Sequence, residues 1–96
     1  MAIDRIAAIT ALLAETSAAH GVYEATVLNG VYHKEWADWY AAYAVDHGIG
    51  DLIGHAVTTD ALAEFLVATN VELEQADPKP AEPWAAYTAG RIAATL

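Results

Sequence analysis

A histidine and a glutamate stand four residues apart in the first third of the sequence, at His20 and Glu24. In a helix this spacing puts both side chains on one face, where they can meet. A carboxylate beside an imidazole orients the ring and raises its basicity, which is what a general acid/base pair needs. The same pair is typical of a core histidine whose carboxylate partner fixes the register of its helix, because structural networks perturb pKa values too. Both interpretations stay open, so we assign no catalytic residue.

His20 and Glu24 could also supply two ligands to a metal ion, with His47 as the third. Di-iron bundles use a Glu-x-x-His motif on two helices together with two further glutamates. No Glu-x-x-His occurs in this sequence, and the absence of cysteine excludes thiolate metal sites, disulfides and cysteine nucleophiles. We therefore predict neither a metal nor another cofactor and keep the three-residue metal site as a narrower alternative.

Aromatic residues follow at helical spacing, at Trp36, Trp39, Tyr40 and Tyr43. Aromatic rings that converge with polar groups are typical of ligand pockets. The same spacing is typical of a buried helix face, and four bulky rings on one short helix could also lie partly at a subunit interface. Core, pocket and interface therefore remain alternatives for this stripe.

Helices have to position these side chains, according to the period of the hydrophobic pattern. We predict four of them, over residues 2–28, over about 35–47, from Thr58 or Thr59 to the proline-rich segment 77–83, and from Pro83 to residue 96. Asn29-Gly30 is a strong helix stop and begins a connection that runs to residue 34. The segment 48–54 is interpreted as a glycine-punctuated loop that plugs the core with Ile49, Leu52 and Ile53.

Each predicted helix has one face that should point inward. The inward face of the first helix comprises Ile6, Ile9, Leu13, Thr16, His20 and Val27. On the second helix the aromatic stripe and His47 point inward, whereas Asp38, Ala41 and Ala42 face away. The third helix contributes Leu62, Phe65, Leu66, Thr69 and Leu73, and its Val67 and Val71 lie on the other side as a candidate dimer seam.

Short connections make consecutive helices antiparallel neighbours. We therefore expect an all-α fold, an up-down four-helix bundle built from two helical hairpins, in a single domain over residues 1–96. A faint internal repeat supports the two hairpins, because Trp36 and Trp39 align with Trp84 and Tyr87.

In such a bundle His20, Tyr43 and Arg91 share one level, and Glu24 lies one turn nearer the loop end. An ionised carboxylate on an apolar face must be paired, and Arg91 is the only charged residue of the last helix. We predict that Arg91 pairs with Glu24, directly or through His20 or a tyrosine hydroxyl. The resulting candidate ligand-binding cluster comprises His20, Tyr23, Glu24, Trp39, Tyr40, Tyr43 and Arg91.

The balance of charge excludes several classes of partner. The 96 residues carry a formal net charge of -9 with four Lys or Arg residues. A nucleic-acid binder needs a basic surface to displace phosphate counterions, and an anionic membrane surface would repel this chain. A basic partner or a cationic ligand is compatible. No segment approaches the roughly 20 apolar residues of a membrane span, and the N-terminus is unlike a signal peptide, so we expect a cytoplasmic protein.

One long motif resembles a known group of proteins. The strings His20-Gly-x-Tyr23-Glu24, Asn29-Gly30-Val31-Tyr32 and Trp36-x-x-Trp39-Tyr40-Ala-x-Tyr43 are similar to segments of small bacterial proteins without an established activity. Similar segments also occur there appended to other small domains. The resemblance covers about residues 20–49 and implies no function. After Tyr32, where that group tends to carry an acid, this chain has His33, so any role of that acid is in doubt.

These observations favour a non-catalytic cytoplasmic domain that binds a protein partner or a small molecule as a homodimer. Dimerisation would add buried area to a small core. The alternative is a small enzyme or a ligand-binding protein with a pocket around His20, Glu24 and Arg91. We assign His33 and His55, which fall in loops, no role beyond contact with solvent.

Overall fold

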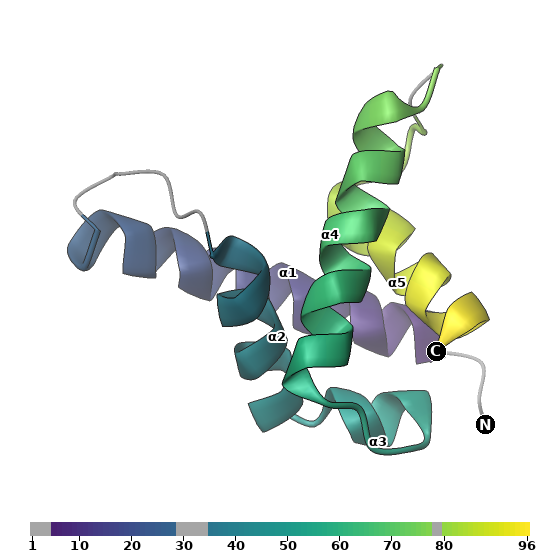
Figure 1. The fold of residues 1–96 in the computed structure, drawn as a ribbon, viewed down its shortest axis with the longest axis horizontal. Helices are drawn as coiled ribbons and strands as arrows, with labels where there is room; N and C mark the ends of the chain where they lie inside the picture. The colour runs from purple at the N-terminus through teal and green to yellow at the C-terminus, as the bar shows by residue number, and fades with distance from the viewer. Residues whose placement is uncertain (1–4, 29–34, 78–79) are drawn as a thin grey trace.

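The computed structural model describes residues 5–28, 35–77 and 80–96, and within these ranges the chain is all-helical with no strand (Figure 1). Five helices are described, namely α1 (Arg5–Thr26), α2 (Trp36–Asp46), α3 (Ile49–Ile53), α4 (Thr59–Gln75) and α5 (Trp84–Thr95). The all-α prediction is therefore confirmed. The predicted helix stop at Asn29-Gly30, the connection over 31–34 and part of the proline-rich segment lie outside the described residues.

Local sequence signals account for the start of α4 and of α5. Thr58 caps α4, because its hydroxyl oxygen accepts a hydrogen bond of 3.1 Å from the backbone N–H of Ala61. Pro83 occupies the extended N-cap position of α5, so the helix begins at Trp84. Of the two predicted starts, Thr58 and Thr59, Thr58 is the N-cap, and the prediction of a helix that starts near Pro83 is confirmed.

The segment between α2 and α4 contains a short helix where the sequence predicts a loop. Gly48 and Gly54 flank α3 with φ angles of 93° and 102°, a left-handed conformation that glycine adopts without steric cost. Ile49 and Ile53 lie one turn apart and are both buried, and Leu52 is half-buried. The loop prediction is wrong. The segment between the two glycines is long enough to form one helical turn, and this turn buries its apolar side chains.

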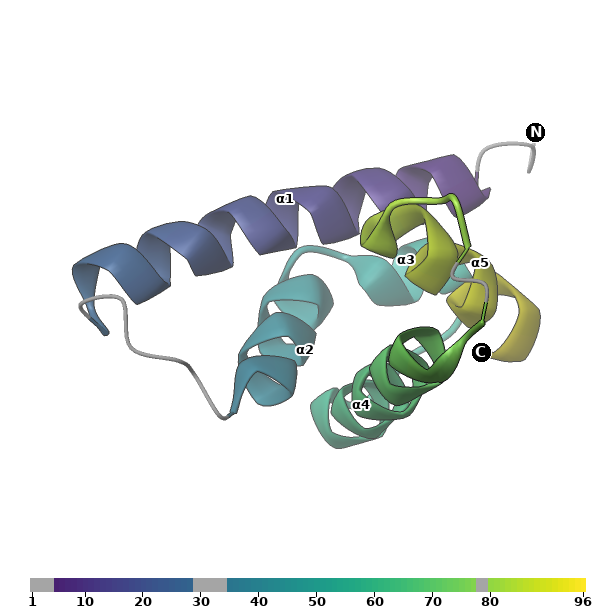
Figure 2. The ribbon, with the colours of Figure 1, turned by 90° about the horizontal axis from the view of Figure 1, so that it is seen from above.

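The helices pack chiefly in the pairs α1 with α5 and α2 with α4. Figure 2 shows α1 along one side of the molecule and α4 on the opposite side, with α2, α3 and α5 between them. In Figure 1, α4 runs across the direction of α1 instead of alongside it. The up-down arrangement of four helices is therefore not confirmed, although the described residues do pack into one compact helical body.

Alanines on α2 explain why this helix has two packed faces. Ala37, Ala41 and Ala44 are buried, and their short side chains let α2 approach α4 closely. The prediction that Ala41 faces away from the protein is wrong, since this residue is fully buried. The aromatic stripe lies on a different side of α2 and meets α1.

The core comprises large aliphatic side chains from every helix except α2. The fully buried ones are Ile9, Leu13, Ile49, Leu62, Leu66 and Ile92. Ile6 and Val27, which the sequence places inward, are 49% and 59% exposed. Both predictions are wrong, and Val27 is exposed because the late part of α1 extends beyond the other helices (Figure 1). Val67 and Val71 are exposed on α4, as predicted.

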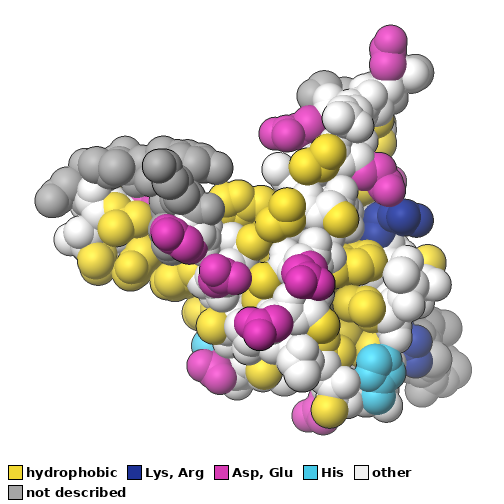
Figure 3. All heavy atoms as spheres, in the orientation of Figure 1, with side chains coloured by type: hydrophobic (Ala, Val, Ile, Leu, Met, Phe, Trp, Pro, Cys, Tyr) yellow, Lys and Arg dark blue, Asp and Glu magenta, His cyan; other side chains and the backbone are white. Residues whose placement is uncertain are grey.

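Within the described ranges, every helix is too short or too polar to span a membrane. The surface carries many more acidic than basic side chains on the face drawn in Figure 3, where carboxylates are spread over several helices. This distribution agrees with the net charge of -9.

Candidate functional site

His20 is a buried polar residue on α1, with 6% of its surface exposed. Its ring centroid lies 5.1 Å from that of Trp39 and 4.9 Å from that of Tyr40, both on α2. The ring of Tyr23, one turn later on α1, is 6.3 Å away and is itself 5.4 Å from Trp39. Four members of the predicted cluster therefore come together as an aromatic contact between α1 and α2.

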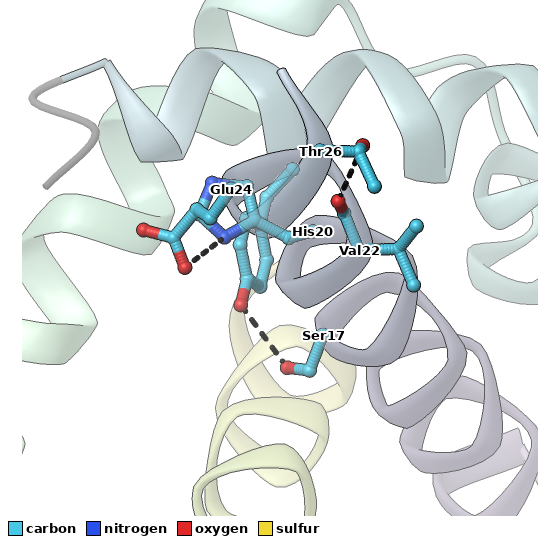
Figure 4. Close-up of polar contacts among 6 residues, drawn as sticks. Ser17, His20, Val22, Glu24 and Thr26 are labelled. Carbon is cyan, nitrogen blue, oxygen red and sulfur yellow. Dashed lines mark hydrogen bonds and ion pairs between the residues drawn. The ribbon is translucent and has the colours of Figure 1, made fainter. Parts of the chain in front are cut away.

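Glu24 lies beside His20, as the four-residue spacing predicts. The Nδ1 atom of His20 and the Oε1 atom of Glu24 are 3.6 Å apart, and the glutamate side chain is 34% exposed. Figure 4 shows both side chains on the same side of α1, whereas Val22 and Thr26 point the other way. At 3.6 Å this pair is longer than a hydrogen bond, so the contact is an ion pair only when the imidazole is protonated.

The helices meet in a register shifted by about one turn from the predicted one. The hydroxyl of Tyr40 lies 3.2 Å from that of Ser17, one turn before His20 (Figure 4). The hydroxyl of Tyr43 donates a hydrogen bond of 2.9 Å to Glu15, and this bond, with smaller contributions from burial and charge, raises the pKa of Tyr43. Tyr43 therefore faces an earlier turn of α1 than His20, although its ring still stacks on Trp39 at 5.5 Å.

Arg91 is not part of this cluster, and the predicted pairing with Glu24 is wrong. Its Nε atom lies 2.9 Å from Oε1 of Glu72 on α4, and its Nη2 donates to Oε2 of the same residue at 3.2 Å. The prediction assumed that α5 presents Arg91 to α1. Instead Ile92 takes the fully buried position on α5, which leaves Arg91 partly exposed beside α4.

The three residues of the alternative metal site are not brought together. His47 stacks on Tyr43 with ring centroids 3.8 Å apart, and its Nδ1 lies 2.7 Å from the carbonyl oxygen of Tyr43. Within the described ranges no three His, Cys, Asp or Glu side chains are grouped as metal ligands. The metal site built from His20, Glu24 and His47 is therefore not supported.

An open pocket of about 400 Å³ lies beside His20, Glu24 and Tyr40. Residues of four helices line it, namely Ser17, His20 and Glu24 of α1, Trp36 and Tyr40 of α2, Asn70 and Glu74 of α4, and Trp84 of α5. His20, Glu24 and Tyr40 belong to the predicted cluster and also line the pocket. Four other members of the predicted cluster do not line the pocket, namely Tyr23, Trp39, Tyr43 and Arg91. Of these, the three aromatic residues support the pocket wall or extend the aromatic contact between α1 and α2.

Four lining residues were missing from the sequence predictions, and for one of them a signal existed. Trp36 was predicted as part of an aromatic stripe that could line a pocket. Ser17 lies three residues before His20, so helical periodicity alone places both on the same face. Asn70 and Glu74 share a face of α4 through the same spacing, but nothing local shows that this face meets α1. Trp84 reaches the pocket only because α5 packs against α1.

Three aromatic rings form the apolar wall of the pocket. The rings of Trp36 and Tyr40 have centroids 5.4 Å apart and planes inclined at 87°, and those of Tyr40 and Trp84 are 5.5 Å apart and inclined at 84°. Successive rings therefore meet almost at right angles, a preferred edge-to-face arrangement. The carboxylates of Glu24 and Glu74 come from α1 and α4 and give the lining a negative charge.

A second, larger hollow of about 550 Å³ lies between α2 and α4. Its lining consists of carboxylates and small or aliphatic side chains, from Glu35, Ala37, Asp38, Asp60, Ala63, Glu64, Val67 and Ala68. None of the described residues that line it is aromatic or a histidine. The pocket at His20 is therefore the better candidate, because it combines ring surfaces with converging polar groups.

The function of this chain is inferred from the geometry of the site. The resemblance of residues 20–49 to a group of bacterial proteins stays a prediction. No protein-family model matches the chain, and it has no match among the curated proteins or the solved structures.

Proposed function

We propose that this chain is a small, non-catalytic binding domain whose ligand site is the pocket at His20. Convergence is the main support, since four helices that are separate in sequence contribute to one pocket of about 400 Å³. This volume falls within the roughly 300–1,000 Å³ of small-molecule sites, which are also mostly lined by apolar and aromatic groups with a few polar ones.

Binding is favoured over catalysis by the surroundings of His20. Aromatic rings of Tyr23, Trp39 and Tyr40 pack around the imidazole, which leaves it 6% exposed. Its contact with Glu24 is 3.6 Å, beyond the hydrogen-bond distance that a positioned acid/base pair uses. We therefore assign His20 to the wall of the pocket. A small enzyme with the same pocket remains the second-ranked hypothesis.

Tryptophan fluorescence provides the test, because Trp36 and Trp84 line the pocket and Trp39 lies behind it. A panel of small cations, neutral aromatics and carboxylates is titrated into the protein, and binding is checked by the rise in melting temperature. We expect at least one class to change the fluorescence and to raise the melting temperature progressively, with the logarithm of ligand concentration once the site is saturated.

A pair of variants shows whether binding occurs in this pocket. Asn70→Phe places a ring in the pocket, whereas Val22→Phe adds the same ring at an exposed position of α1 outside it. We expect Asn70→Phe to abolish binding and Val22→Phe to preserve it. Binding that survives Asn70→Phe, or the absence of binding by every class, would refute the proposal.

We also propose that the domain acts in the cytoplasm as a homodimer, with the outer face of α4 at the seam. Val67 and Val71 lie one turn apart on that face and are 46% and 43% exposed. Light scattering across a range of protein concentrations tests the dimer, with Val71→Lys as the variant expected to give the mass of one chain. A wild-type mass of one chain at every concentration would exclude it.

A further inference from the structure

The pocket at His20 combines an aromatic wall with two carboxylates, and from this combination we infer that its ligand is an organic cation with a quaternary ammonium head group. The inference rests on the proposed function, because it names the chemical class that the same pocket receives. It depends on the arrangement of three rings, on the charge of the lining and on the positions of the basic side chains.

The three rings suit a cation because they present several ring surfaces at one place. Trp36, Tyr40 and Trp84 line the pocket, and successive ring planes are inclined at 87° and 84°, so the rings face different directions. Ring faces carry negative electrostatic potential and attract a cation within about 6 Å of the ring centroid, most strongly for tryptophan. Methyl groups on the nitrogen can also contact such rings as apolar surface.

The charge of the lining adds attraction for a cation. Glu24 of α1 and Glu74 of α4 both line the pocket, so two carboxylates are near its occupant. Among the residues that the structure describes, no Lys or Arg lines the pocket. A neutral or anionic occupant would have to remove water from these carboxylates without compensation, which is unfavourable.

The two described arginines are engaged elsewhere and do not neutralise the pocket. Arg91 is held by both oxygens of Glu72, on the outer side of the contact between α4 and α5. Arg5 lies near Gly54 at the start of α1, with about 22 Å of helix between it and His20 at 1.5 Å per residue.

The lining fits an organic cation better than a metal ion. Divalent metals need several oxygen, nitrogen or sulfur ligands at once, and the described residues hold no group of three such side chains. A quaternary ammonium ion needs no directed ligand. It is stabilised by ring faces and by carboxylates at a distance, which is what Trp36, Tyr40, Trp84, Glu24 and Glu74 offer.

Choline and its neutral isostere 3,3-dimethylbutan-1-ol provide the test, because they share shape and differ in charge. Titration calorimetry and tryptophan fluorescence measure both affinities. We expect choline to bind and the isostere to bind about 10-fold more weakly, the ratio that cation–π attraction gives in a partly desolvated site. Choline affinity should also fall as ionic strength rises, because salt screens the two carboxylates.

A quaternary ammonium group can belong to a free metabolite or to a methylated lysine of a protein. A second titration therefore uses trimethyllysine amide with its amino group acetylated. Binding of either compound supports the inference, and the tighter of the two identifies the source of the head group.

Two glutamates on α4 form a matched pair of variants. Glu74 lines the pocket, whereas Glu72, two residues earlier, pairs with Arg91 outside it. We expect Glu74→Gln to weaken choline binding about 3- to 10-fold and Glu72→Gln to leave it unchanged, because only Glu74 can contact the ligand. Trp84→Leu should weaken binding similarly and Trp84→Phe should restore most of it, since phenylalanine retains a ring face.

The outcomes separate this inference from the proposed function. Equal affinity for choline and the isostere, or choline affinity unchanged by Glu74→Gln, would overturn the cation inference. If a neutral or anionic class binds instead and Asn70→Phe blocks it, the pocket is still a binding site and only the ligand class is wrong. If no class binds, both proposals fail.

Discussion

Arg91 of α5 and Glu72 of α4 form a two-point ion pair, with Nε 2.9 Å from Oε1 and Nη2 3.2 Å from Oε2. The hydroxyl of Tyr87 donates a third bond of 2.6 Å to the same carboxylate. These bonds join two helices that otherwise share a small contact. Glu72 thus links α4 to α5 at a point outside the pocket.

Replacing Glu72 by glutamine should destabilise the protein slightly. Exposed ion pairs contribute about 0.2–1 kcal/mol, and both side chains here are nearly half exposed, at 44% and 46%. Urea denaturation should show this loss at low salt and a smaller one at high salt, because salt screens the pair. Glu74→Gln is the control, since Glu74 makes no ion pair among the described residues; an equal loss in both variants would contradict the assignment.

The same variant has a spectroscopic signature. The hydrogen bond to Glu72, followed by burial and the charge of the carboxylate, raises the pKa of Tyr87 above its ordinary value of 10.0. Glu72→Gln should therefore move one tyrosine titration at 295 nm to lower pH. Tyr87→Phe identifies the titration that belongs to this residue.

The hydrogen bonds of His55 predict that the stability of the folded protein depends on pH. Its Nε2 lies 2.6 Å from the backbone oxygen of Leu96 and its Nδ1 lies 3.1 Å from that of Ala56. Both partners are acceptors, so only the protonated ring can donate to both at once. These two bonds, first the one to Leu96, raise the pKa of His55 above its ordinary value of 6.5, against smaller opposing effects of burial and of Arg5.

Because the folded pKa is raised, His55 stabilises the fold fully below the unfolded pKa of about 6.5 and loses this effect as pH rises through the folded value. The melting temperature of wild type minus that of His55→Gln should therefore be largest near pH 5.5 and shrink toward pH 8.5. A difference that is constant or grows with pH would contradict the role of this ring, for which the sequence predicted solvent contact alone.

Thr88 of α5 is a buried threonine whose hydroxyl makes no hydrogen bond among the residues described. A buried hydroxyl without a partner costs about 1–3 kcal/mol relative to an apolar group of the same shape. Thr88→Val should therefore raise the free energy of unfolding, by up to about 1 kcal/mol once relaxation of the wild-type hydroxyl is allowed for.

Thr16 of α1 provides the matched control for this change. It is equally buried, but its hydroxyl donates a bond of 2.7 Å to the carbonyl oxygen of Leu12. Thr16→Val removes that bond and should stabilise the protein less than Thr88→Val or destabilise it. Thermal unfolding of the two variants under one condition compares them, and a larger gain for Thr16→Val would contradict the assignment.

Local signals in the sequence determined the secondary structure and part of the site. Threonine at position 58 caps α4, prolines end the segment before α5, and the 3.6-residue period places His20 on the buried face of α1 beside Glu24. These features depend on residues within one or two turns of each other. The chain itself therefore carries enough information to predict them.

The tertiary structure alone decided how the helices cross. The alanine side and the aromatic side of α2 are both apolar, so the hydrophobic pattern could not show that Ala41 meets α4 while Tyr40 meets α1. A different crossing also gave Arg91 the partner Glu72 and brought Trp84 and Glu74 to the pocket. Periodicity fixes which side of a helix is buried, but the angle and register between helices depend on the fit of many side chains at once.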